Sequence, residues 1–276
     1  MKYCLDYKKY GKYMDSADEL NINFRREDTS LFDFLSERKH QRVNISIPDQ
    51  EDFLENNDIE IFRAMVEKDS ELNFVIKLED YHSDTTKKIY KQIRGEFKYF
   101  FSTFVRDWDT LLGYVSLKPT DIYVVENLCF ELDKVARILH SWDIHVRAFP
   151  NVAQSSWYNT KDLKKFFIRP DDIDFYGNYI DTVEFMGPRD SIGTYYKIYA
   201  IDKKWFGKLN EIIIDFNSEL DSRHILPHFA EMRVKCRKRC FKGGTCRVCE
   251  AIESTSKTLE NNGMIIEKVK NNNSND

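Results

Sequence analysis

The sequence predicts an α/β fold in which parallel strands close into a (β/α) barrel. Short runs rich in Val, Ile, Phe and Tyr recur over the first 190 or so residues, and amphipathic stretches separate several of them. The runs repeat at intervals of roughly 20 to 30 residues, which is typical of strand–helix–strand units. An open, doubly wound sheet is the alternative, although no Gly-rich phosphate loop follows any run, which disfavours its Rossmann form.

Seven of these runs have the composition of buried or half-buried strands. An eighth, at residues 2–7, would give the strand number of a closed barrel. The seven cover residues 43–47, 73–78, 99–105, 121–126, 144–149, 166–169 and 182–186.

Helices are predicted where apolar residues recur at helical spacing. Residues 53–68 place Ile59, Phe62 and Val66 on one face, and residues 131–142 do the same with Leu132, Val135 and Leu139. Further helices are expected at residues 31–37, 204–216 and 250–261.

The amino-acid composition limits the classes of protein to which this chain can belong. With 42% hydrophobic and 32% charged residues, the chain can bury a large core and keep a solvated surface. The net charge of -4 gives no global attraction to nucleic acid or acidic membranes. No stretch approaches the roughly 18 to 20 apolar residues of a membrane helix, and the first residues lack the apolar core of a secretion signal. We therefore expect a cytoplasmic protein with no membrane partner.

The pattern divides the chain into three parts. Residues 1–200 form the expected barrel-like domain, and residues 201–267 form a helical extension that contains a cluster of cysteines. Residues 268–276 are polar throughout and are expected to be disordered.

Four cysteines of the extension have the spacing C-x3-C-x5-C-x2-C: Cys236, Cys240, Cys246 and Cys249. Closely spaced thiols converge on one metal ion with little loss of chain entropy, and Gly243-Gly244 allows the backbone to turn between the two pairs. Thiols stay reduced in the cytoplasm, where such a cluster favours metal over disulfides. The spacing predicts one metal centre, either zinc or a [4Fe–4S] cluster, and does not separate the two.

Basic residues surround these cysteines. They partly offset the charge of four thiolates, which favours metal binding at neutral pH. They are equally suited to contact the phosphates of RNA or another nucleic acid, so both interpretations stay open. The residues are Arg237, Lys238, Arg239, Lys242 and Arg247.

The run Phe-Phe-Ile-Arg-Pro-Asp-Asp-Ile-Asp-Phe-Tyr at residues 166–176, followed by the run at 180–187 that ends in Met-Gly, resembles a segment of the peptidase U32 family. There a strand ending in Phe-Ile-Arg-Pro-Glu-Asp-Leu leads into a short helix and another strand. The resemblance implies a barrel-like fold. The family name implies proteolysis, but many relatives are similar to iron–sulfur proteins that help to hydroxylate RNA bases or quinone precursors. This chain has Gly-Pro-Arg at 187–189 where the family has Gly-Arg, and its cysteines lie in one compact run.

Polar residues near the ends of the predicted strands are candidates for a pocket, because the carboxyl ends of barrel strands surround the active site. Each has an ordinary alternative as a hydrogen-bonded structural residue or a solvated charge. They are Arg169, Glu184, Arg147, Glu126 and Asn151.

Two functions follow. The first is an enzyme, a barrel with a metal centre that acts on RNA or a small metabolite. The second is a non-catalytic protein whose zinc-stapled cysteine module binds nucleic acid or protein. The sequence contains no G-x-S-x-G elbow and no P-loop, so neither serine hydrolysis nor P-loop phosphoryl transfer is indicated.

Overall fold

The computed structural model describes residues 1–7, 11–28, 30–154, 161–226, 228–239 and 246–264. Within them, parallel strands form one sheet in the order β5-β4-β3-β2-β1-β9-β8-β7-β6. The strands are β1 (Lys2–Asp6), β2 (Glu19–Asn23), β3 (Arg42–Ser46), β4 (Phe74–Leu78), β5 (Tyr99–Phe101), β6 (Phe104–Val105), β7 (Asp121–Val124), β8 (His145–Ala148) and β9 (Thr182–Glu184).

The two edge strands of this order are consecutive pieces of one run of chain. Only Ser102 and Thr103 separate β5, which pairs with β4, from β6, which pairs with β7. The amide of Thr120, just before β7, also donates to the carbonyl of Tyr99 at 2.8 Å. The interrupted run at residues 99–105 therefore closes the sheet into a barrel, as the sequence predicts, and the open-sheet alternative is wrong.

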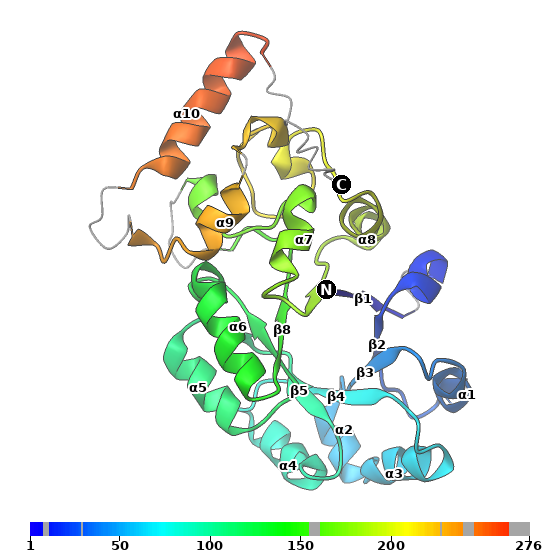
Figure 1. The fold of residues 1–276 in the computed structure, drawn as a ribbon. Helices are drawn as coiled ribbons and strands as arrows, with labels where there is room; N and C mark the ends of the chain where they lie inside the picture. Colours follow the sequence, from blue (N-terminus) through cyan, green and yellow to red (C-terminus); the bar gives the residue numbers. More distant parts are fainter. Residues whose placement is uncertain (8–10, 29, 155–160, 227, 240–245, 265–276) are drawn as a thin grey trace, which may run out of the picture.

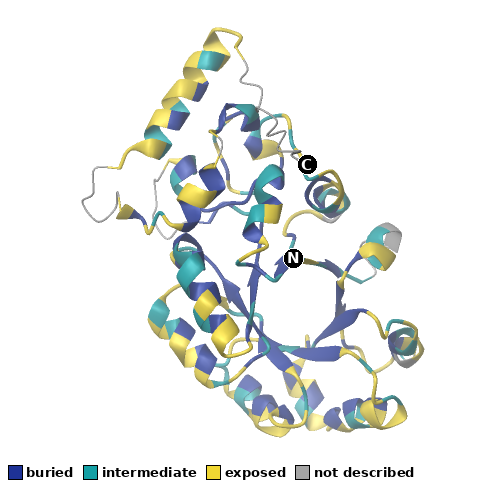
Figure 2. Ribbon diagram, viewed as in Figure 1, coloured by how far each residue is buried: buried dark blue, intermediate teal, exposed yellow. Residues whose placement is uncertain are grey.

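Helices cover the outside of the barrel and expose their outer faces (Figures 1 and 2). Side chains cap several of their first turns: Ser83 accepts from the Thr86 amide, and Asp107 accepts from the Thr110 amide. The helices are α1 (Ser30–Glu37), α2 (Gln50–Glu55), α3 (Ile59–Lys68), α4 (Asp84–Ile93), α5 (Trp108–Ser116), α6 (Leu132–Ser141) and α8 (Arg189–Tyr196), which continues into a π-helical turn (Lys197–Asp202).

The predicted helices at 31–37, 131–142 and 250–261 are confirmed as α1, α6 and α10 (Val248–Asn261). The helix predicted over 53–68 is wrong as a single element. The chain breaks between α2 and α3, where Asn57 has a left-handed φ of 54° that a continuous helix cannot contain.

Two further predictions are wrong. Residues 166–169 form no strand, because Phe166 makes only an isolated bridge to Gln154 before Pro170 opens a 3-10 turn. Residues 204–216 hold a 3-10 turn (Leu209–Glu211) in place of a helix, and Lys208 makes an isolated bridge to Asp221.

The C-terminal part of the chain packs on the barrel through α9 (Phe229–Val234), which contacts α7 (Ile173–Tyr176) and the 3-10 turn at Leu128–Glu131. In Figure 1, α9 and α10 lie beyond the N-terminal end of α6. Arg233 of α9 is buried and donates to the carbonyls of Leu163 and Lys165, in the segment that follows β8. One hydrophobic core includes residues from both parts, among them Leu20, Val234 and Ile252. The boundary at residue 200 stays a prediction, and the expected tail at 268–276 lies outside the described residues.

Among the described helices, none has the length and apolar character needed to cross a lipid bilayer.

Candidate functional site

Charged side chains fill part of the barrel interior. Nη1 of Arg147 lies 2.7 Å from Glu19 and 3.2 Å from Asp121, and Arg42 pairs with the same aspartate. The Thr182 hydroxyl donates to Glu19 at 3.0 Å. Burial opposes ionisation, but the two guanidinium groups outweigh it and hold the pKa values of Glu19 and Asp121 below their ordinary range. Two cations and two anions make a balanced, buried network that holds opposite walls of the barrel together.

A second cluster lies toward the carboxyl ends of the strands. Glu184 is the last residue of β9, Lys77 is the last but one of β4, and the hydroxyl of Tyr123 on β7 donates to Glu184 at 2.5 Å. The ammonium of Lys77 lies 3.7 Å from the other oxygen of Glu184. Both charged side chains are 16% exposed, so solvent reaches them. We call Lys77, Tyr123 and Glu184 the mouth cluster.

Within the mouth cluster, the pKa of Glu184 is lowered and the pKa of Tyr123 is raised. Burial opposes the charge of Glu184, but Lys77, Arg147 and the Tyr123 hydrogen bond keep its pKa below the ordinary value. Burial, and then the charge of Glu184, raise the pKa of Tyr123 well above 10. At neutral pH the cluster therefore combines a carboxylate that can accept a proton with a hydroxyl and an ammonium that can donate hydrogen bonds.

Arg147 connects the two clusters. Its Nη2 lies 4.0 Å from Glu184, and both Nε and Nη2 are buried with no hydrogen-bond partner among the described residues. A buried donor without a partner is costly, and a catalytic role or a bound group is among the explanations for such a donor. The guanidinium therefore strengthens the positive potential beneath the carboxylate of Glu184.

Of the five predicted pocket residues, the structure brings Glu184 and Arg147 together inside the barrel. Asn151 follows β8 by three residues, and its side-chain amide has a structural role. It donates to the carbonyl of Met186 at 2.7 Å and accepts from the backbone amide of Met186 at 3.1 Å. This reciprocal pair joins the ends of β8 and β9.

The other two residues lie apart from the mouth cluster. Glu126 follows β7 with a left-handed φ of 50° and pairs with Arg106 at 3.3 Å. Arg169 is buried, with its side chain held by Asp172 and directed to the carbonyl of Ser222. The contacts of Arg169 are those of a structural residue.

Sequence reasoning missed Lys77 and Tyr123. Both lie in correctly predicted strands, and a lysine within the apolar run Phe-Val-Ile-Lys-Leu was the available signal. Lysine is seldom buried in a strand without a partner, so its position near the strand end points to a charge inside the barrel.

The predicted cysteine centre is described only in part. Cys236 and Cys249 are half-buried beside the core, Cys246 is exposed, and Cys240 lies outside the described residues. No cluster of three or more potential ligands occurs among the residues that the structure describes. Four thiolates are a suitable donor set for zinc or an iron–sulfur cluster, so the metal centre stays a prediction.

We call residues 236–249 the cysteine segment; its first part is fastened to the loop that follows β7. Lys238 is buried, donates to Asn127 at 2.7 Å and lies 4.7 Å from the ring centre of Phe130. The neighbouring Arg237 pairs with Asp133 at 3.0 Å. Because this loop leaves the carboxyl end of β7, the cysteine segment is attached at the same end of the barrel as the mouth cluster.

The basic residues that were predicted to contact nucleic acid differ in how accessible they are. Lys238 is enclosed and cannot reach a phosphate in this conformation, and Arg237 is held by an ion pair. Arg239 and Arg247 are exposed, and Lys242 lies outside the described residues. Within the described part of the chain, the exposed Arg239 and Arg247 are therefore the basic residues best placed to contact a phosphate.

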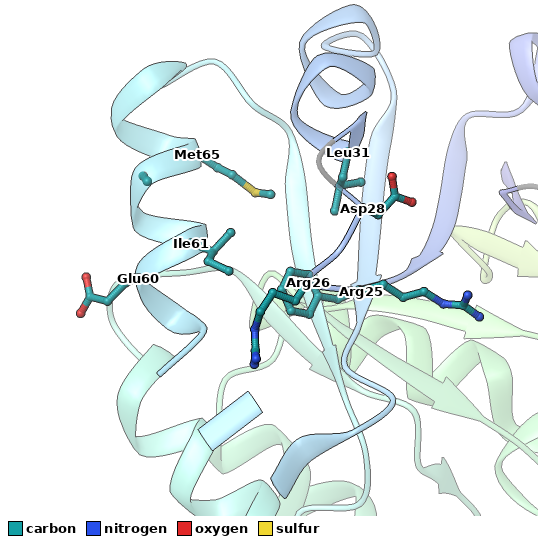
Figure 3. A pocket seen from close by; sticks show the side chains of 9 residues that line it. Arg25, Arg26, Asp28, Leu31, Glu60, Ile61 and Met65 are labelled. Carbon is teal, nitrogen blue, oxygen red and sulfur yellow. The ribbon is translucent and has the colours of Figure 1, made fainter. Parts of the chain in front are cut away.

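A separate pocket of about 350 Å³ lies outside the ring of strands, between α1 and α3. Figure 3 shows Ile61 and Met65 reaching from α3 toward Leu31. Part of its charged lining is engaged elsewhere: Arg26 binds Asp58 through two hydrogen bonds of 2.9 and 2.7 Å, and Glu60 pairs with Arg63. The pocket is mainly apolar, and its lining residues include no tyrosine beside a carboxylate, as the mouth cluster does.

Comparison with known proteins leaves the family open. No protein-family model and no curated protein sequence matches the chain. Among solved structures, the fold is similar to RipC from Yersinia pestis, with 10% sequence identity and a TM-score of 0.36 over 72% of this chain and 95% of that chain. A TM-score of 0.36 is too low to assign a fold, and the barrel is established by the strand pairing described above.

Proposed function

We propose that the protein is a metal-dependent barrel enzyme that acts on RNA or a small metabolite at the carboxyl end of its strands. The observation that carries the proposal is the attachment of the cysteine segment, through Lys238, to the loop that continues from β7. The same strand contributes Tyr123 to the mouth cluster. Active sites of (β/α) barrels lie at this end.

The mouth cluster suits a reaction in which a proton is moved. The carboxylate of Glu184 would take a proton from the substrate and become a carboxylic acid, while the Lys77 ammonium and the Tyr123 hydroxyl stabilise negative charge that develops on the substrate. Arg147 lies beneath Glu184 and is a positioning residue, because its buried charge keeps that carboxylate ionised before the reaction.

The four cysteines would hold the metal. A zinc ion closed by four thiolates has no open position and would stabilise the fold, whereas a [4Fe–4S] cluster supplies electron transfer when bound. The similarity of residues 166–187 to the U32 family favours a non-peptidase activity of the iron–sulfur kind, and the described residues offer no activated nucleophile at the mouth cluster.

Substrate profiling tests the enzymatic claim. Purified protein, prepared without oxygen, is incubated with a metabolite extract and with total RNA, which is then digested to nucleosides, and both are compared by mass spectrometry before and after. We expect at least one compound to be consumed and one to form. Glu184→Gln should lower that rate by roughly 10²- to 10⁴-fold, because it removes a general base and keeps the side-chain shape.

Glu67→Gln is the matched control, because Glu67 is an exposed residue of α3 on the outside of the barrel. It should leave the rate unchanged. No conversion with the metal-loaded wild-type protein, or equal rates for wild type and Glu184→Gln, would contradict the enzymatic claim.

One observation favours the alternative, a non-catalytic module that binds nucleic acid. Arg239 and Arg247 are exposed and flank Cys240 and Cys246 in the sequence. This function predicts that Cys246→Ser abolishes RNA association while the wild-type protein converts nothing. RNA binding that survives in a folded Cys246→Ser protein would contradict it.

A further inference from the structure

We infer that the barrel has a second binding site, at the amino ends of its strands, for the phosphate monoester of a small metabolite. The site is a pocket of about 540 Å³ beside the last turns of α4 and α5. The mouth cluster lies at the opposite ends of the strands, so this inference does not depend on the proposed enzyme.

Two loops form this pocket. Residues 94–98 connect α4 to β5, and residues 117–120 connect α5 to β7. The loops are joined where the barrel closes: the hydroxyl of Tyr99 donates to the carbonyl of Leu117, and the amide of Thr120 donates to the carbonyl of Tyr99 at 2.8 Å. A ligand held by both loops would therefore also stabilise the closure of the sheet.

The charged residues of the pocket are all basic. Arg94, Lys98 and Lys118 line it and are exposed, and its lining contains no carboxylate among the described residues. Within that part of the chain, none of the three forms an ion pair. The carboxylate nearest in sequence, Glu96, is held by Arg63 of α3 through two hydrogen bonds of 2.6 and 3.0 Å. The pocket therefore has a strong positive potential that favours an anion.

The ends of two helices reduce this potential without cancelling it. The carboxyl ends of α4 and α5 lie at the pocket, and each corresponds to roughly half a negative charge. Three cations therefore leave a net charge of about +2. A phosphate monoester carries a charge of about −1.5 to −2 at pH 7, whereas a simple carboxylate carries a single negative charge. The charge balance favours a phosphate monoester.

The size and the walls of the pocket indicate a ligand larger than the phosphate group itself. Sites for small organic molecules occupy roughly 300–1,000 Å³, a range that includes this pocket. Tyr90, Phe97 and Tyr99 line it, and the rings of the two tyrosines pack edge-on with centres 5.3 Å apart. The guanidinium of Arg94 lies 5.8 Å from the ring centre of Tyr90, which places a bidentate phosphate donor beside an apolar wall for the rest of the ligand.

Isothermal titration calorimetry of the full chain tests the inference. The probes are phenyl phosphate, glucose 6-phosphate and inorganic phosphate, with phenol and glucose as uncharged controls. At least one ester should bind, inorganic phosphate should bind more weakly, and the uncharged compounds should not bind. Added salt should weaken the binding, because the three cations are exposed.

Lys118→Gly is the most informative variant. Lys118 has a left-handed φ of 55°, which glycine adopts freely, so the substitution removes the charge and leaves the loop unstrained. It should weaken ester binding by about tenfold or more, as should Arg94→Gln, because each removes a charged hydrogen-bond donor. Lys88→Gln should have no effect, since Lys88 is an exposed residue of α4 outside the lining.

Two further measurements locate the site. Ester binding should slow amide hydrogen exchange in residues 94–98 and 117–120, which form the loops of the pocket. Glu184→Gln should bind the ester as the wild type does, because the mouth cluster lies at the other end of the strands.

Four results would overturn the inference. They are the absence of binding to every phosphate compound, equal affinity of the wild type, Lys118→Gly and Arg94→Gln, loss of ester binding in Glu184→Gln, and tighter binding of a single-stranded RNA oligonucleotide than of any ester. The last result would assign the basic residues to a nucleic-acid surface. The enzymatic claim is tested separately, by turnover that depends on Glu184.

Discussion

The ammonium of Lys238 lies 2.7 Å from Oδ1 of Asn127, and this hydrogen bond joins the cysteine segment to the loop that leaves β7. The ring of Phe130, 4.7 Å away, covers the same ammonium. Lys238 itself adopts a left-handed φ of 49°, which is uncommon for a residue with a side chain and requires support from its surroundings. The contact therefore fixes how the proposed metal centre approaches the barrel.

Lys238→Ala should loosen this attachment. A hydrogen bond that involves a charged group contributes about 1.5–3 kcal/mol, so local opening of α9 and residues 235–239 should increase by roughly tenfold or more. Amide hydrogen exchange measured by mass spectrometry reports this directly. Lys235→Ala, which removes an exposed lysine paired with Glu231, is the control. Equal exchange in the two variants would show that Lys238 does not hold the segment.

Removal of the metal should affect the same region and spare the barrel. Treatment with a strong chelator should make residues 229–261 sensitive to protease while residues 1–184 stay resistant, because four thiolates without metal no longer hold the segment together. Limited proteolysis with identification of the fragments measures this. Cleavage that is identical with and without chelator would argue against a metal in the segment.

Arg147 should be required for stability. Arg147→Leu leaves Glu19 without its closest cation and Asp121 with one of two, and the loss of one partner from a buried ion pair costs about 3–5 kcal/mol. Urea unfolding measures the change. The exposed pair of Lys235 with Glu231 is the comparison, and Lys235→Met should change stability by at most about 0.5 kcal/mol. A small effect at Arg147 would mean that the interior network is not needed.

Stability should fall at both extremes of pH. The folded-state pKa values of Glu19, Asp121 and Glu184 are lowered, so their contribution is present above their unfolded values near 4 and is lost as the pH falls through the folded values. The pKa of Tyr123 is raised, so its contribution is present below pH 10 and is lost as the pH rises further. Thermal unfolding between pH 2 and 12 tests both directions.

A Glu184→Gln protein should keep part of the acid sensitivity, because Glu19 and Asp121 still titrate. It should lose less stability than the wild type between pH 5 and pH 3. If stability falls equally with pH in the two proteins, the neighbours of Glu184 do not lower its pKa.

The strand pattern predicted the barrel well because most strands are short, largely buried runs rich in Val, Ile, Phe and Tyr, as β4 and β7 are. The strand β2 was not predicted, since its sequence Glu-Leu-Asn-Ile-Asn directs Glu19 and Asn21 into the polar interior, where the usual apolar signal is missing. The same polar interior explains why the site was predicted only in part. Glu184 and Arg147 were found as polar residues near strand ends, but their joint position with Lys77 depends on barrel closure at residues 99–105, which no local pattern shows.

The metal content of the protein tests the central claim most directly. After purification without oxygen, elemental analysis should give about one zinc per chain with no visible absorption, or about four irons per chain with a brown colour and broad absorption. Cys236→Ser and Cys246→Ser should lose the metal, whereas Cys4→Ser, at a buried cysteine of β1, should keep it. A wild-type protein without stoichiometric metal, or metal retained in both cysteine-segment variants, would contradict the account.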